Sequence, residues 1–113
     1  MKKNLKKEGK CYELNGKWFQ ENQHLPNIRL VHGEVMGQGE LSGIPYAHCW
    51  VEIDDMVIDL TIPPKCVPKA TYYKVGQIDT LNNTHMYDSE SYLDNILRHK
   101  HWGPWDLKSS SGL

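Results

Sequence analysis

The segment Tyr46–Leu60, YAHCWVEIDDMVIDL, constrains the fold more than any other part of the sequence. Its alternation of apolar and polar residues is interrupted by two adjacent aspartates, which predicts two antiparallel strands joined by a two-residue turn at 54–55. In that register Val51 pairs with Ile58. A slip of one residue would turn Asp59 toward the core, so the register is well specified.

This register sorts the predicted hairpin into two faces, because side chains alternate across a strand. One face is apolar throughout and carries Ala47, Cys49, Val51, Ile53, Met56, Ile58, Leu60 and Ile62. The other face carries Tyr46, His48, Trp50, Glu52, Val57, Asp59 and Thr61. On it His48 and Asp59 are diagonal neighbours, about 7 Å apart at the backbone. They form either a structural pair on a half-exposed face or part of a catalytic site in which the carboxylate orients the imidazole.

The segments on either side of the hairpin extend the predicted sheet. Ile28–Met36 alternates as a strand, and the glycine-rich loop Gly37–Gly43 follows without the spacing of a phosphate-binding motif. After the hairpin, three prolines in IPPKCVPK interrupt regular structure. Ala70–Ile78 is rich in residues that favour strands and predicts a fourth strand. Thr84–Tyr87 is expected to add edge pairing.

The chain from Ser89 onward predicts a helix, with Asp88 or Ser89 as its N-cap and basic residues in its last turn. Its apolar stripe consists of Tyr92, Leu93, Ile96 and Leu97. The segment HWGPWD stops this helix with a Gly-Pro pair. Its two tryptophans are expected to cover the core.

The segment Cys11–Glu21, CYELNGKWFQE, allows two interpretations. Asn15-Gly16 between alternating residues is a strong signal for a hairpin turn, and a glycine costs a helix about 1 kcal/mol. Against this, apolar and amide residues also fit one side of a helix that begins near Cys11: Tyr12, Asn15, Trp18 and Phe19. Secondary-structure propensity alone does not decide between the hairpin and the helix.

Length and charge limit the function classes. A chain of 113 residues predicts a single domain, with residues 1–7 and 108–113 expected to be flexible. With 13 basic and 14 acidic side chains, no net field favours nucleic acid, and five lysines among the first ten residues indicate a solvated end. No window resembles an export signal or a membrane span, which predicts a soluble cytoplasmic protein without a membrane partner. The sequence does not indicate an oligomeric state.

The three cysteines form neither a disulfide framework nor a zinc motif. Cys49 is adjacent to His48, so it points to the opposite, apolar face as a core thiol. Cys66 lies among prolines and is interpreted as a loop bystander. Cys11 remains as the candidate nucleophile. If it opens a helix, the dipole and free N–H groups there would lower its thiol pKa and could stabilise an oxyanion.

A metal site could be sought among five histidines: His32, His48, His85, His99 and His101. The HKH spacing at 99–101 would place two rings on one side only in a strand, yet it lies where a helix ends. Exposed surface histidines are the favoured interpretation. The sequence therefore predicts no metal and no cofactor.

The Cys-Tyr-Glu segment, followed by AHCWVEIDDMVID as a His-bearing strand paired with an Asp-bearing strand, resembles the transglutaminase-like and papain-like cysteine-enzyme fold. In that family the order is Cys, His, Asp, with HAWVE…VD typical around the last two. Here the order is Cys11, His48, Asp59, and the string from 8 to 105 is similar to small bacterial and phage proteins of this type. A glutamine upstream of Cys11 for the oxyanion hole is missing, and Asn4 is the nearest amide.

The resemblance favours the helix interpretation of the first segment. It implies an α+β fold in which an N-terminal helix carrying Cys11 packs on about four antiparallel strands, with a C-terminal helix. The implied function is acyl transfer on an amide, ester or thioester of a peptide, protein or small molecule, in a bacterial or phage-host cytoplasm. Cys11 is the expected nucleophile, His48 the proton shuttle and Asp59 its orienting group.

Three further residues are expected to bind substrate: Tyr46 and Trp50 on the His48 face, and Gln38 in the glycine-rich loop. The alternative function is a binding module that keeps this fold without turnover and holds a peptide or small ligand on the Trp50 face.

Overall fold

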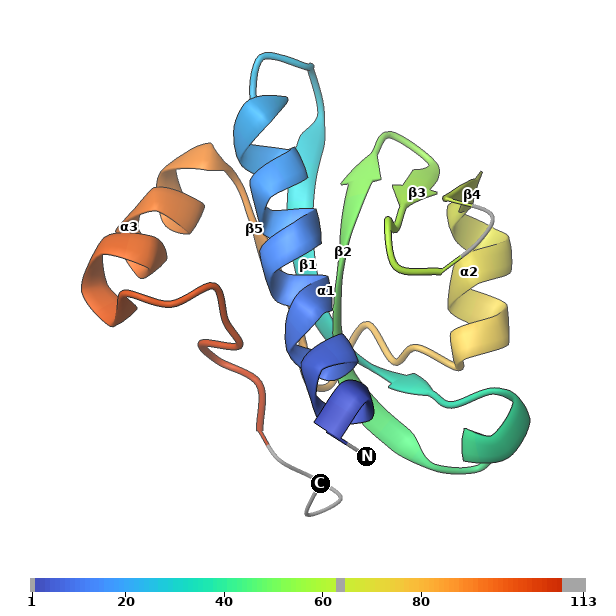
Figure 1. Cartoon of the computed structure of the whole chain (residues 1–113). Helices are drawn as coiled ribbons and strands as arrows, with labels where there is room; N and C mark the ends of the chain where they lie inside the picture. The colour runs from blue at the N-terminus through green and yellow to red at the C-terminus, as the bar shows by residue number, and fades with distance from the viewer. Residues whose placement is uncertain (1, 63–64, 109–113) are drawn as a thin grey trace.

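Figure 1 shows a computed structural model of the chain, which describes residues 2–62 and 65–108, with side chains from residue 10 onward. The elements in chain order are α1 (Lys2–Glu21), β1 (Ile28–Met36), the short 3-10 helix η1 (Gly39–Leu41), β2 (Pro45–Ile53), β3 (Met56–Ile58), β4 (Cys66–Pro68), α2 (Lys69–Gly76), β5 (Thr84–Tyr87) and α3 (Ser89–His99). The predicted α+β class is confirmed. Among these residues no helix has the length and apolar character needed to span a bilayer. The predicted flexibility of 1–7 and 108–113 stays a prediction, since Met1 and 109–113 lie outside the described residues.

One antiparallel sheet of five strands, in the order β4-β3-β2-β1-β5, organises the molecule. The predicted hairpin register is confirmed, because Val51 pairs with Ile58 across a turn at 54–55. Asp54 occupies the left-handed region at φ 51°, a conformation that aspartate tolerates better than most residues. The strand Ile28–Met36 and the edge pairing by Thr84–Tyr87 are confirmed too.

The first segment is a helix, and it lies across β1 and β2 (Figure 1). Cys11, Tyr12, Asn15 and Phe19 are all buried, as expected for residues three or four apart on one helical face. This packing outweighs the local preference of Asn15-Gly16 for a turn. The packing of Trp102 explains the glycine at position 16, because a Cβ there would lie 3.1 Å from Cε3 of Trp102. The prediction that the helix begins near Cys11 is wrong, since α1 begins at Lys2.

The prediction of a fourth strand at Ala70–Ile78 is also wrong, because Lys69–Gly76 forms α2. The two adjacent tyrosines that suggested a strand instead reach different partners from one helix. Tyr72 packs on Trp50 at 5.3 Å between ring centroids, and Tyr73 packs on the same indole at 6.1 Å. The fourth strand is the short β4, within the proline-rich segment where none was expected. Tertiary packing has overridden β-propensity here.

The C-terminal helix α3 has the predicted N-cap. The Asp88 carboxylate accepts from Ser91 N–H, and the Ser91 hydroxyl accepts from Asp88 N–H in a capping box. Its predicted apolar stripe needs correction, because Leu93 and Leu97 are 55% and 65% exposed while Tyr92 is buried. The two tryptophans of HWGPWD pack against the core as expected.

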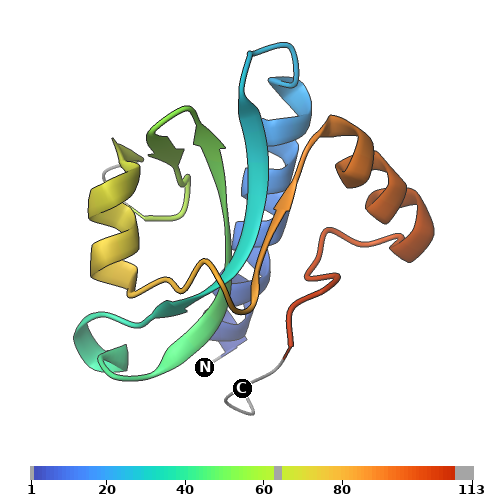
Figure 2. The ribbon, with the colours of Figure 1, turned by 180° about the vertical axis from the view of Figure 1, so that it is seen from behind.

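The sheet carries a core on both faces. On the α1 side Cys49 and Val51 pack with Phe19 and Tyr92. On the other side Trp50, Val31 and Val57 form a second cluster, covered in part by Tyr72 and Tyr73 of α2. Seen from behind in Figure 2, α1 lies beyond β1, and α2 and α3 stand on opposite sides of the molecule, as they do in Figure 1. The His48 face is therefore buried rather than half-exposed, because the segment expected as a strand is a covering helix.

Candidate functional site

His48 and Asp59 meet beside an open stretch of β2. Strand β3 pairs with β2 only along residues 51–53, so among the described residues no strand continues past His48 on this side of β2, while β1 pairs with it on the other side. Asp59 follows directly after β3, and its Oδ2 lies 2.7 Å from His48 Nε2. The predicted contact between the two side chains is confirmed, and it is almost closed to solvent, with 5% of His48 and 2% of Asp59 exposed.

Asp59 is saturated with hydrogen-bond donors. The Tyr72 hydroxyl donates to Oδ2 at 2.8 Å, while Thr61 donates to Oδ1 from its hydroxyl at 2.7 Å and from its backbone N–H at 3.0 Å. Burial alone would raise the pKa of Asp59, but the bond with His48 and these hydroxyl donors lower it well below its usual range. The carboxylate is therefore ionised and fixed in orientation. Burial and the adjacent Asp59 raise the pKa of Tyr72, which keeps its proton for this bond.

Cys11 joins the pair from α1. Burial alone would lower the pKa of His48, but hydrogen bonds with Asp59 and with Cys11, together with their charges, raise it to about 9. Because Nε2 faces Asp59, Nδ1 is the ring nitrogen left for the sulfur. The structure thus brings together the three residues that the sequence singled out, in the order sulfur, imidazole, carboxylate.

The helical setting of Cys11 differs from the expected one. Cys11 lies well inside α1, which begins at Lys2, so its N–H belongs to the helical hydrogen-bond ladder and the dipole of a first turn does not act on it. Cys49 is buried as predicted, and burial raises the pKa of its thiol. Cys66 is exposed, but the prediction that it lies in a loop is wrong, because it opens strand β4.

Asn15 is a site residue that the sequence reasoning missed. One turn after Cys11, its Nδ2 donates to the Cys49 carbonyl at 2.9 Å and to Asp59 Oδ1 at 3.2 Å. Its Oδ1 accepts from Leu60 N–H at 2.9 Å. The side-chain amide therefore replaces the missing strand beside β2. The signal available was the helical spacing from Cys11, which the Asn-Gly turn motif concealed.

Replacing Asn15 with alanine is expected to lower the free energy of unfolding by about 2–4 kcal/mol, because buried polar groups of Cys49 and Leu60 lose their partner. Urea unfolding followed by circular dichroism measures it. Asn22→Ala is the matched control, since among the described residues the side-chain amide of Asn22 hydrogen-bonds only the Trp18 carbonyl, in the part-buried turn that follows α1. We expect the control to lose less than about 1 kcal/mol. Equal losses for the two variants would refute the anchoring role of Asn15.

The three residues expected to bind substrate have different surroundings. Trp50 is fully buried between His48 and α2, so its indole offers no surface to a ligand and instead supports the imidazole from inside. Tyr46 packs edge to face on His48 at 5.6 Å between ring centroids. Tyr46 and Gln38 both line a cavity of about 250 Å³ between β1, β2 and α2.

A buried carboxylate holds α2 against the sheet below this cavity. Glu52 is fully buried and accepts from Arg29 Nε at 2.9 Å and from Trp50 Nε1 at 3.0 Å. It also accepts from the Tyr73 hydroxyl of α2, and Lys69 Nζ lies 3.4 Å away. Breaking such a paired buried charge is costly, so this network fixes the helix that supplies Tyr72.

The expectation of exposed histidines is wrong for His32, which is fully buried among the rings of Tyr12, Tyr87 and Trp105. Within the described chain neither of its ring nitrogens has a hydrogen-bond partner. Burial lowers the pKa of His32 to about 3, and a neighbouring histidine, His85, adds to the effect. The ring is therefore neutral. No group of three or more metal-ligating side chains occurs in the described residues.

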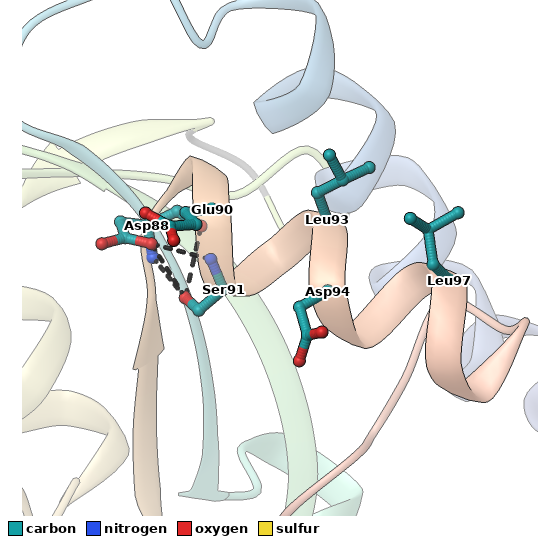
Figure 3. A pocket seen from close by; sticks show the side chains of 6 residues that line it. All are labelled: Asp88, Glu90, Ser91, Leu93, Asp94 and Leu97. Atoms are coloured by element: carbon teal, nitrogen blue, oxygen red, sulfur yellow. Dashed lines mark hydrogen bonds between the residues drawn. The ribbon is translucent and has the colours of Figure 1, made fainter.

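A larger hollow, about 540 Å³, lies on the first turns of α3 (Figure 3). Its polar wall is the capping box, in which Asp88 and Ser91 already satisfy each other. Its apolar wall is formed by Leu93 and Leu97, which project on one side of the helix. None of its lining residues belongs to the Cys11 site, so size alone does not mark the chemistry here.

The site as a whole is a hydrogen-bonded series of a thiol, an imidazole and a carboxylate, in which Cys11 is 1% exposed. Asn15, Thr61 and Tyr72 fix the carboxylate, and the apolar cavity begins at Tyr46 and Tyr72. Comparisons of the chain with protein-family models, with curated proteins and with solved structures gave no match.

Proposed function

We propose that this protein is a cysteine-dependent acyl-transfer enzyme of the transglutaminase-like and papain-like type, acting in the cytoplasm on an amide, ester or thioester. The observation that carries the proposal is the hydrogen-bonded series Cys11, His48, Asp59. Three separate elements, α1, β2 and the segment after β3, contribute one member each.

In the first step His48 takes the proton of the Cys11 thiol, and the sulfur attacks the carbonyl carbon of the substrate and forms a thioester. The bond to the leaving group breaks, and His48 donates its proton to the departing amine, alcohol or thiol. In the second step water, or an acceptor amine, attacks the thioester and gives a proton to His48. The acid or amide product departs, and His48 returns its proton to the sulfur, which restores the thiol. Asp59 stays ionised throughout and holds the ring in the tautomer that both proton transfers require.

Trapping the thioester tests this proposal directly. A Cys66→Ser protein, which lacks the exposed thiol, is mixed with p-nitrophenyl butyrate, quenched in acid and measured by intact mass and peptide mapping. We expect one butyryl adduct on Cys11, removed by hydroxylamine. An unmodified Cys11 under conditions that release p-nitrophenolate would contradict the proposal.

The second candidate is the non-catalytic binding module, and the observation that favours it is the 1% exposure of Cys11. A substrate reaches this sulfur only if part of the surrounding structure moves, whereas a ligand that binds the adjacent cavity does not need it. Saturable binding of a ligand in a protein whose Cys11 forms no adduct, unchanged by Cys11→Ala, would favour this candidate.

A further inference from the structure

The cavity of about 250 Å³ directly adjoins the acid–base pair. Two of its lining residues contact the site: Tyr46 packs on the His48 ring, and Tyr72 donates to Asp59. Most of the remaining wall comes from the end of β1, from β4 and from α2. A group bound in the cavity is therefore separated from the imidazole of His48 by a single side chain, that of Tyr46.

The lining chemistry excludes a charged occupant. None of the described residues that line the cavity carries a charge, and its walls are formed mainly by Val35, Val67, Tyr72, Val75 and Gly76. The one amide, Gln38, already donates to the carbonyls of Met36 and Val75, both at 3.2 Å. A charged group placed there would lose its hydration without a partner, at a cost of several kcal/mol.

The size selects a part of a molecule rather than a whole ligand. Sites for complete drug-sized ligands enclose about 300–1,000 Å³, and this cavity lies below that range. The close packing around Gly76 limits the size of the cavity at one side. A Cβ at this position would lie 3.5 Å from Val35 Cβ and 3.3 Å from the Ile78 side chain. The volume therefore suits one apolar side chain or a short alkyl chain.

From these observations we infer that the cavity binds the apolar part of the acyl group, which makes the enzyme selective for short, uncharged acyl chains. The inference rests on the proposed function. The leaving group must depart before the second step, while the acyl group stays attached to Cys11 through both steps. An apolar cavity beside His48 suits the group that stays.

Acyl-chain selectivity tests the inference with p-nitrophenyl acetate, butyrate and hexanoate, which share one leaving group. We expect kcat/KM to rise at least about tenfold from acetate to the longer esters, because each added methylene enters an apolar cavity. Thr71→Phe and Val75→Phe, which add rings to the cavity wall from α2, should abolish this rise. Ala70→Phe, on the same helix but outside the lining, should keep the full rise.

A second series separates failure of the inference from failure of the proposed function. N-methyl and N-hexyl iodoacetamide alkylate a thiol without any enzymatic turnover. Intact-mass measurements over time give the alkylation rate for each reagent. If the N-hexyl reagent reacts faster at Cys11, and this advantage is lost in Thr71→Phe and Val75→Phe but kept in Ala70→Phe, the cavity binds the alkyl chain. This outcome supports the inference even if no ester is hydrolysed. Ester turnover that depends on Cys11 but shows the same chain-length profile in all these variants overturns the inference and leaves the proposed function standing.

Discussion

Cys11→Ala is expected to reduce p-nitrophenyl ester turnover to the uncatalysed background, a loss of at least about 10⁴-fold, because no thioester can form without the sulfur. The substitution removes one atom from a buried position on α1 and leaves the bond between His48 and Asp59 in place. The loss should therefore appear in activity and not in the fold. Steady-state rates, with circular dichroism to confirm folding, measure both.

The other two cysteines provide the controls. Cys66→Ala, at an exposed position, should leave turnover and melting temperature unchanged. Cys49→Ala should lower stability by about 1 kcal/mol through a small core cavity and retain turnover. If Cys11→Ala kept more than a tenth of the wild-type rate, Cys11 could not be the nucleophile.

Asp59→Asn is expected to lower kcat by about 10³–10⁴-fold, the loss seen when a triad aspartate becomes an amide. Its new NH₂ group would face the imidazole nitrogen that now faces a carboxylate oxygen, so the ring would lose its orienting acceptor. The substitution keeps the shape of the side chain, and Thr61 and Asn15 still surround it. The exposed turn residue gives the matched control, Asp55→Asn, which should change neither kcat nor the pH profile.

The pH profile separates an orienting role for Asp59 from a merely structural one. His48 must be protonated to release an amine or alkoxide leaving group, so the wild-type kcat/KM for an amide or alkyl ester should fall as the pH rises through about 9, the pKa of His48. The bond with Asp59 is the largest influence that raises this pKa, and its loss should move the alkaline limb toward neutral pH by at least about one unit. If the alkaline limb of the pH profile stayed at the same pH in Asp59→Asn, Asp59 would not act through His48.

The hairpin was predictable because one local rule decided it. In Tyr46–Leu60 the alternation and the adjacent aspartates agreed, and a slipped register would have turned Asp59 into the core. The contact between His48 and Asp59 followed from that register alone. Where local signals and packing conflicted, the sequence misled: Ala70–Ile78 has strand propensity, yet the surface it covers requires a helix that reaches Trp50 and Asp59 at once.

The remaining gaps concern contacts between elements distant in sequence. Asn15 has its role because α1 crosses the open stretch of β2, and nothing near Asn15 in the sequence reports this crossing. Trp50 is buried because α2 covers it, and His32 is buried because Trp105 returns to it from the end of the chain. The identity of the candidate site was therefore readable from residue types and strand register. The contacts that fix the carboxylate and the helix that covers the site could not be predicted from the sequence.

The position of Cys11 and Asn15 on one helix divides the site into two separable halves. Residues 28–108 carry the imidazole and the carboxylate, while residues 2–21 carry the sulfur and the amide that clamps the carboxylate. The connection between them is the short segment 22–27. Two fragments divided there would recover a complete site only on meeting, so the recovered chemistry would serve as a reporter of their association.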